Sequence, residues 1–86
     1  MRIKFKKGKQ REFLNIAIKK LNCLSLRGIL QFGLDTSYDC LKNYYTERRL
    51  MDKVFFDDLC HLSKINVNDL KIDYLEDNWG QVKGKK

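Results

Sequence analysis

Apolar residues spaced three or four positions apart recur through most of this 86-residue chain, and short polar turns interrupt them. Such spacing is typical of amphipathic helices that bury one face. It predicts four helices, at residues 10–21, 25–32, 36–45 and 52–65. The sequence contains no proline, so the turns must rely on Gly, Asn, Asp and Ser. We therefore expect a mainly helical domain.

The predicted buried faces include most of the large apolar residues. They comprise Phe13, Leu14, Ala17, Ile18 and Leu21 in the first helix, Leu26, Ile29, Leu30 and Phe32 in the second, and Phe55, Phe56, Leu59, Cys60 and Leu62 in the fourth. Ser25 and Asp52 are expected to cap the second and fourth helices. Gly28 costs a helix about 1 kcal/mol relative to Ala, which indicates tight packing, or the close approach of a DNA backbone, at that position.

Both ends of the chain alternate in period two. Met1, Ile3 and Phe5 alternate with basic residues, and residues 70–75 alternate similarly. Alternation predicts strands, so we expect a small two-stranded antiparallel sheet between the terminal segments. A flexible basic arm is the alternative for the N-terminus. The expected organisation is a single domain, 1–86, with a strand or arm at 1–9, a helical core at 10–65, and a C-terminal strand and basic tail at 66–86.

The net charge of +7 is unevenly distributed along the chain. Residues 1–22 hold eight Lys or Arg against Glu12 alone, which gives +7, whereas residues 51–80 hold three against seven acidic residues, which gives −4. This asymmetry favours an anionic partner, with nucleic acid first and an anionic membrane surface second. A solvated basic tail is the remaining alternative. Within the tail, Trp79 either packs onto the helices or offers a surface on which bases stack.

The reactive residue types do not form a recognisable metal or catalytic pattern. Cys23, Cys40 and Cys60 are odd in number and widely spaced, which argues against a disulfide framework and favours small core residues. A zinc site would need paired ligands, but Cys60 and His61 are adjacent and diverge on a helix. Adjacent carboxylates at 57–58 diverge in the same way. We therefore expect no enzyme activity, no metal, no cofactor and no small-molecule substrate.

The sequence also lacks membrane and export signals. Its longest apolar runs span a few residues, whereas a helix that crosses a bilayer needs roughly 20. The basic N-terminus has no apolar stretch of the kind that a secretory signal requires. We therefore expect a cytoplasmic protein with no membrane partner.

The joint between the second and third predicted helices is a turn at residues 33–36 that begins with Gly33. A hydroxyl at Thr36 or Ser37 can cap the next helix. Two helices joined by a short turn containing Gly form a helix-turn-helix, in which the second helix lies in the DNA major groove. With Leu41 and Tyr44 facing the core, the residues expected to read DNA are Ser37, Tyr38, Asp39, Lys42, Asn43 and Tyr45.

Side-chain chemistry separates base-reading residues from phosphate-binding residues. Asn43 can pair with adenine, and Lys42 can reach guanine acceptors or phosphates. Cations beside the motif can clamp phosphates, although an exposed turn in which Glu47 pairs with the arginines is an alternative. The predicted phosphate contacts are Ser25, Arg27, Gln31, Arg48, Arg49, Lys6, Lys7 and Lys9.

At SLRGILQFG, TSYDCLKNYYTERRLM and KVFFDDLCHLSKIN the sequence resembles the lambda-repressor-like, or XRE-type, helix-turn-helix class. The positions that match its pattern are Gly33, Ser37, Leu41, Tyr44, Arg48 and Arg49. The joint is one or two residues longer than usual, and Met51 stands where proline often follows the basic turn. YDCLKNYYTERRL, FFDDLCHLSKI and NWGQVKG are also similar to small archaeal helix-turn-helix proteins, and related segments occur with LAGLIDADG-type proteins.

The resemblance implies a four- to five-helix domain that binds double-stranded DNA, with transcription regulation as its role and a homodimer on a palindromic site. It does not imply catalysis, because the LAGLIDADG motif is absent from this sequence. An RNA-binding module and a protein-interaction module that use the same fold are the alternatives. The target sequence, the regulated process and the direction of regulation do not follow from the sequence.

Overall fold

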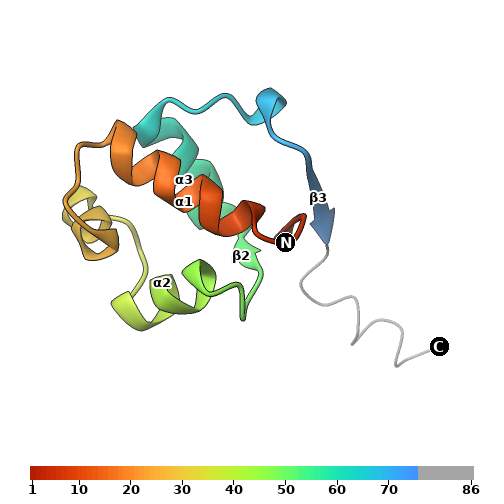
Figure 1. Ribbon diagram of the computed structural model, residues 1–86, viewed down its shortest axis with the longest axis horizontal. Coiled ribbons are helices and arrows are strands. Elements are labelled where there is room, and N and C mark those ends of the chain that lie inside the picture. The colour runs from red at the N-terminus through yellow and green to blue at the C-terminus, as the bar shows by residue number, and fades with distance from the viewer. Residues whose placement is uncertain (76–86) are drawn as a thin grey trace.

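Three α-helices, two 3₁₀ helices and three short strands make up residues 1–75, the part of the chain that the computed structural model describes (Figure 1). In chain order they are β1 (Arg2–Phe5), α1 (Lys9–Lys20), η1 (Leu26–Phe32), α2 (Tyr38–Tyr45), β2 (Met51–Asp52), α3 (Lys53–Ser63), η2 (Val67–Asp69) and β3 (Ile72–Leu75). The expected tail with Trp79 lies outside the described residues.

The three α-helices form close to their predicted positions because local signals start and stop them. The Asp52 carboxylate caps α3 and accepts from Val54 N at 3.1 Å, as predicted. Each α-helix is followed by a non-glycine residue in the left-handed region, namely Asn22, Glu47 and Lys64, with φ between 57° and 63°. Such a residue lets the chain reverse direction and satisfies the last carbonyls of a helix.

Aromatic rings from three elements meet at the centre of the core. Phe5 of β1, Phe13 of α1 and Phe56 of α3 have ring centroids 5.2 to 5.9 Å apart. The buried hydrophobic residues are Ile3, Phe13, Leu14, Ala17, Ile29, Leu34, Leu41, Tyr44, Met51, Phe55, Phe56, Leu59 and Cys60. The apolar stripes predicted for the first and fourth helices therefore face the core, with Leu62 half-buried.

The sheet has three strands in the order β2-β1-β3, so the predicted two-stranded sheet is incomplete. β1 pairs antiparallel with β3 from Arg2↔Leu75 to Phe5↔Ile72, as the alternation predicts. It also pairs with β2 through Ile3↔Met51. Two residues are too few to show alternation, which is why β2 gave no sequence signal. Because β1 is the central strand and Ile3 is fully buried, the alternative of a flexible N-terminal arm is wrong for residues 2–5.

The second predicted helix forms η1, a 3₁₀ helix, and it lacks the expected cap. Ser25 precedes it, but its side chain makes no capping hydrogen bond. Of the predicted buried face only Ile29 is fully buried, and Phe32 is 41% exposed at the point where the chain turns at Gly33. A side chain at Gly28 would meet Cys23 Cβ at 3.1 Å. The close neighbour at Gly28 is therefore the preceding loop of the same chain.

The aromatic cluster gives a direct test of the core. Phe56→Ala should lower the free energy of unfolding by about 3–5 kcal/mol, because the ring leaves a cavity among neighbours that cannot close it. Urea denaturation followed by circular dichroism measures the loss. Val54→Ala on the same helix is the control, since Val54 is 65% exposed and should change stability by less than about 0.5 kcal/mol. Equal losses in both variants would contradict this packing.

Candidate nucleic-acid interface

α2 has one buried face and one outward face. Leu41 is fully buried and Tyr44 is 3% exposed, with the Tyr44 ring 5.2 Å from that of Phe55 in α3. Lys42 on the opposite side is exposed and Asn43 is half-buried. The predicted division of this helix into a core face and an outward face is therefore confirmed.

Hydrogen bonds fix both ends of α2. Ser37 Oγ accepts from Cys40 N at 3.2 Å, which is the predicted N-cap. At the other end Arg48 N donates to Asn43 O at 3.0 Å, and Glu47 N donates to Tyr44 O at 3.1 Å. This pair of bonds is the Schellman motif, with Glu47 in the left-handed position. The helix and the turn after it therefore form one continuous hydrogen-bonded unit.

An open hollow of about 320 Å³ lies on the outward face of α2. Its lining residues are Asp39, Lys42, Asn43, Thr46 and Arg48. Asp39 Oδ1 lies 3.5 Å from Lys42 Nζ, but both side chains are exposed, so the ion pair contributes little to stability. One amide and two cations therefore face a common space from the side of α2 that the core does not cover.

Tyr38 brings a cation from η1 beside α2. The guanidinium of Arg27 lies over the Tyr38 ring, 4.3 Å from its centroid, and Lys42 Nζ lies 5.2 Å from the same centroid. Each cation is attracted to the ring's electron-rich face. Tyr38 therefore holds Arg27 and Lys42 near one another at the edge of the outward face.

Tyr45 is directed toward α1. Its hydroxyl donates to Asn15 Oδ1 at 3.0 Å, and the guanidinium of Arg11 lies 5.4 Å from its ring centroid. The sequence analysis includes Tyr45 among the residues expected to read DNA, but here its side chain is half-buried. Its contacts dock α2 on α1 and do not extend the outward face.

Arg48 and Arg49 diverge. Arg48 lines the hollow on the outward face, whereas Arg49 lines a second hollow of about 520 Å³ that also contains Asp35, Asp52 and Asp58. Neighbouring residues of an irregular turn need not share a direction. The predicted paired clamp is therefore divided, and Arg48 alone contributes to the outward face.

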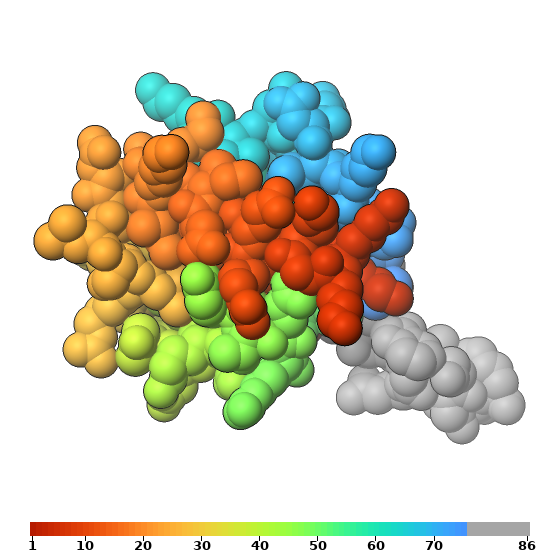
Figure 2. All heavy atoms as spheres, in the orientation of Figure 1, coloured from red at the N-terminus to blue at the C-terminus, as the bar shows by residue number. Residues whose placement is uncertain are grey.

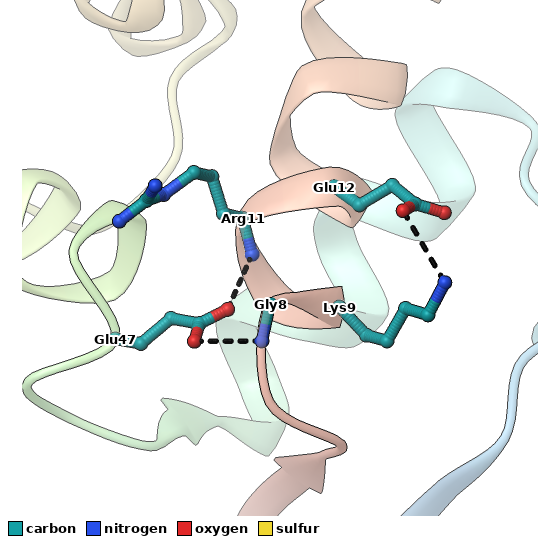
Figure 3. Close-up of polar contacts among 5 residues, drawn as sticks. All are labelled: Gly8, Lys9, Arg11, Glu12 and Glu47. Carbon is teal, nitrogen blue, oxygen red and sulfur yellow. Dashed lines mark hydrogen bonds and ion pairs between the residues drawn. The ribbon is translucent and has the colours of Figure 1, made fainter.

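Glu47 connects the turn after α2 to the start of α1 (Figure 3). Its Oε1 accepts from Gly8 N at 2.9 Å and its Oε2 accepts from Arg11 N at 3.1 Å. These donors are the unsatisfied amides of a helix N-terminus, which favours negative charge. The hydrogen bond from Gly8 is the main reason that the pKa of Glu47 lies below its usual value. Glu47 therefore caps α1 and does not pair with the neighbouring arginines.

Gln10 strengthens the same contact from the α1 side. It is 3% exposed, and its Nε2 donates to Tyr44 O and to Arg49 O, both at 2.8 Å. The Arg11 side chain adds a bond from Nε to Tyr45 O at 3.0 Å. Sequence reasoning missed Gln10 and this role of Glu47, because each partner lies more than 30 residues away and leaves no local signal.

The loop before α1 and the first residue of that helix carry the predicted phosphate-binding lysines. Lys6, Lys7 and Lys9 are exposed, and Lys9 Nζ lies 3.4 Å from the carboxylate of Glu12. Figure 2 shows the N-terminal segment next to the segment around α2 on the face turned toward the viewer. The bond from Gly8 to Glu47 makes this adjacency part of the fold.

The remaining predicted phosphate contacts lie around η1. Ser25, Arg27 and Gln31 are all exposed. Arg27 and Gln31 are four positions apart, and in a 3₁₀ helix, which has three residues per turn, this spacing separates them by about 120°. Arg27 contacts α2 through the Tyr38 ring.

No family model, no curated protein sequence and no solved structure matches this chain. Within residues 1–75, no three His, Cys, Asp or Glu side chains lie close enough together to hold a metal ion. None of the helices described for this chain is long and apolar enough to cross a bilayer. A proposed function must therefore rest on the arrangement of the residues around α2.

The cap that Glu47 provides predicts pH-dependent stability. Because its folded pKa is lowered, the stabilisation is complete above the usual glutamate pKa of about 4.3 and is lost as the pH falls through the folded value. Glu47→Gln should cost about 1 kcal/mol at pH 7, in the range of a lost helix cap. Thermal unfolding of both proteins between pH 7 and pH 3 measures this. A difference in melting temperature that does not shrink toward pH 3 would contradict the cap.

The three cysteines are free thiols, and burial distinguishes Cys60 from the other two. Burial raises the pKa of Cys60 to about 11, while Cys23 and Cys40 are half-buried. At pH 8 only about a thousandth of the Cys60 thiol would be ionised, and the thiolate is the reactive form. We expect iodoacetamide to alkylate Cys60 last, as followed by peptide mass spectrometry. Early labelling of Cys60 in the folded protein would contradict its burial.

Proposed function

We propose that this protein binds double-stranded DNA sequence-specifically through the outward face of α2, as a transcription regulator. The observation that carries the proposal is the open hollow on that face, where Lys42, Asn43 and Arg48 meet. Asn43 has the donor and acceptor needed to pair with adenine, and Lys42 suits the acceptors of guanine. The opposite face of α2 is held against the core, so the helix is free to enter a groove on one side only.

Cations around this face would supply the affinity that does not depend on sequence. Arg48 lies at the end of α2, and Arg27 lies beside its first turn. The loop with Lys6 and Lys7 is joined to the turn after α2 through Gly8. Phosphate contacts of this kind fix the register of a protein on the duplex and make binding strongly dependent on salt.

We propose the lambda-repressor-like class for this domain, with η1 and α2 as the two helices of the motif. The turn between them, residues 33–37, has Gly33 at φ 78°, and Ser37 caps the second helix. As in that class, the proposed form on DNA is a two-fold dimer on a palindromic site. The proposed place of action is the cytoplasm, and no catalytic step or cofactor forms part of the proposal.

Selection from a random pool of duplex DNA at moderate salt tests the proposal. Enrichment of one motif supports a specific regulator, and a palindromic motif supports the dimer. Parallel measurements with structured and single-stranded RNA address the RNA-binding alternative, which tighter binding to RNA would favour. No binding to any nucleic acid, even at low salt, would reject the proposal and leave the protein-interaction alternative.

Point variants on α2 and in the turn after it give the sharper prediction. Asn43→Ala should weaken binding to the selected site by about 1–3 kcal/mol and relax the preference at one base pair. Arg48→Ala should weaken binding to all sequences and reduce the salt slope by about 1. Fluorescence anisotropy measures both effects.

The control for this prediction is Lys64→Asn at the far end of α3. This change removes one positive charge and keeps a residue that tolerates the left-handed conformation of Lys64, at φ 59°. Figure 1 shows the end of α3 and helix α2 on opposite sides of α1. An effect of Lys64→Asn as large as that of Arg48→Ala would mean that net charge, and not the outward face of α2, determines binding.

A further inference from the structure

Two basic segments that are distant in the sequence meet through one carboxylate. The loop before α1 carries Lys6 and Lys7, and the outward face of α2 ends at Arg48. Glu47 lies between them and accepts from Gly8 N at 2.9 Å, 39 positions earlier in the chain. Figure 3 shows the Glu47 carboxylate directed at the first turn of α1, and its second oxygen accepts from Arg11 N at 3.1 Å.

Glu47 is an unfavourable residue in two respects. Its φ of 63° lies in the left-handed region, where glycine is the residue without steric cost and is the usual choice after a helix. Its negative charge also lies among exposed lysines and arginines, where it weakens the attraction of any anion. In return, Glu47 makes the two hydrogen bonds that fix Gly8 and Arg11 to the turn after α2, beside those that Gln10 and the Arg11 side chain make.

We propose that Glu47 is a positioning residue for nucleic-acid binding, which holds the lysines of the loop at a fixed spacing from the outward face of α2. The inference rests on the proposed function and adds a second contact region with a defined spacing. A single duplex then meets both segments at once, and the loop does not have to be ordered when binding occurs. Groups fixed before binding contribute more affinity than groups that must be immobilised on contact.

A positioning role for Glu47 and simple electrostatics predict opposite changes in DNA affinity for the substitution Glu47→Gly. Glu47→Gly removes the carboxylate and suits the left-handed backbone, so the turn after α2 is preserved. The lost negative charge alone would tighten DNA binding. We expect instead about tenfold weaker binding to the selected duplex, and a salt slope lower by about 2 because Lys6 and Lys7 no longer contact phosphates.

The matched control is Glu12→Gln. Glu12 is an exposed acid in the first turn of α1, and it forms an ion pair with Lys9 inside that helix. Figure 3 shows it directed away from Glu47. The substitution changes the net charge by the same amount as Glu47→Gly, but it leaves the contact between the two basic segments intact. We expect unchanged or slightly tighter binding for this variant.

A double-mutant cycle with Lys7→Ala separates positioning from a general loss of structure. Lys7→Ala should weaken binding several-fold in the wild-type protein and hardly at all in Glu47→Gly, with circular dichroism confirming that both fold. If wild type binds DNA, but Glu47→Gly binds as well as Glu12→Gln and Lys7→Ala costs the same in both backgrounds, the inference is wrong and the proposed function stands. If wild type binds no DNA, the proposed function is wrong and the inference with it.

Discussion

The contact between the start of α1 and the turn after α2 holds the loop that carries Lys6 and Lys7 beside the end of α2. Gln10 enters this contact as a buried side chain and supplies two donors to the carbonyl groups of Tyr44 and Arg49. Glu47 supplies the acceptors that the first turn of α1 lacks. Each segment thus satisfies the backbone groups that the other leaves unpaired. α2 can therefore be short and still have one defined orientation.

The fold was predictable where the signal is local. The spacing of apolar residues and the caps at Ser37 and Asp52 depend on neighbours within one helical turn, and α1, α2 and α3 form as expected. The pairing of β1 with β3 was predictable from two alternating segments. β2 was not, because Met51–Asp52 pairs only through its position after the turn. Nor does apolar spacing in a seven-residue segment distinguish the 3₁₀ form of η1 from an α-helix.

The residues of the candidate interface were likewise predictable only where the signal is local. The outward direction of Lys42 and Asn43 follows from the burial of Leu41, which the sequence indicates. The directions of the side chains in the turn after α2 depend on α1, whose contacts with that turn join residues more than 30 positions apart. Sequence reasoning therefore identified the face of α2 and could not separate Arg48 from Arg49.

The central place of β1 in the sheet has a consequence for a chain that is still being made. During synthesis β1 is made before both of its partners, and its pairing with β3 cannot be completed until Leu75 has been made. Until then the edge of β1 that pairs with β3 is open, and such strand edges pair readily with those of other chains. The basic residues at alternate positions of β1, Arg2 and Lys4, repel an identical strand. The alternating basic residues of β1 therefore oppose pairing between incomplete copies of this chain, whatever they bind once it has folded.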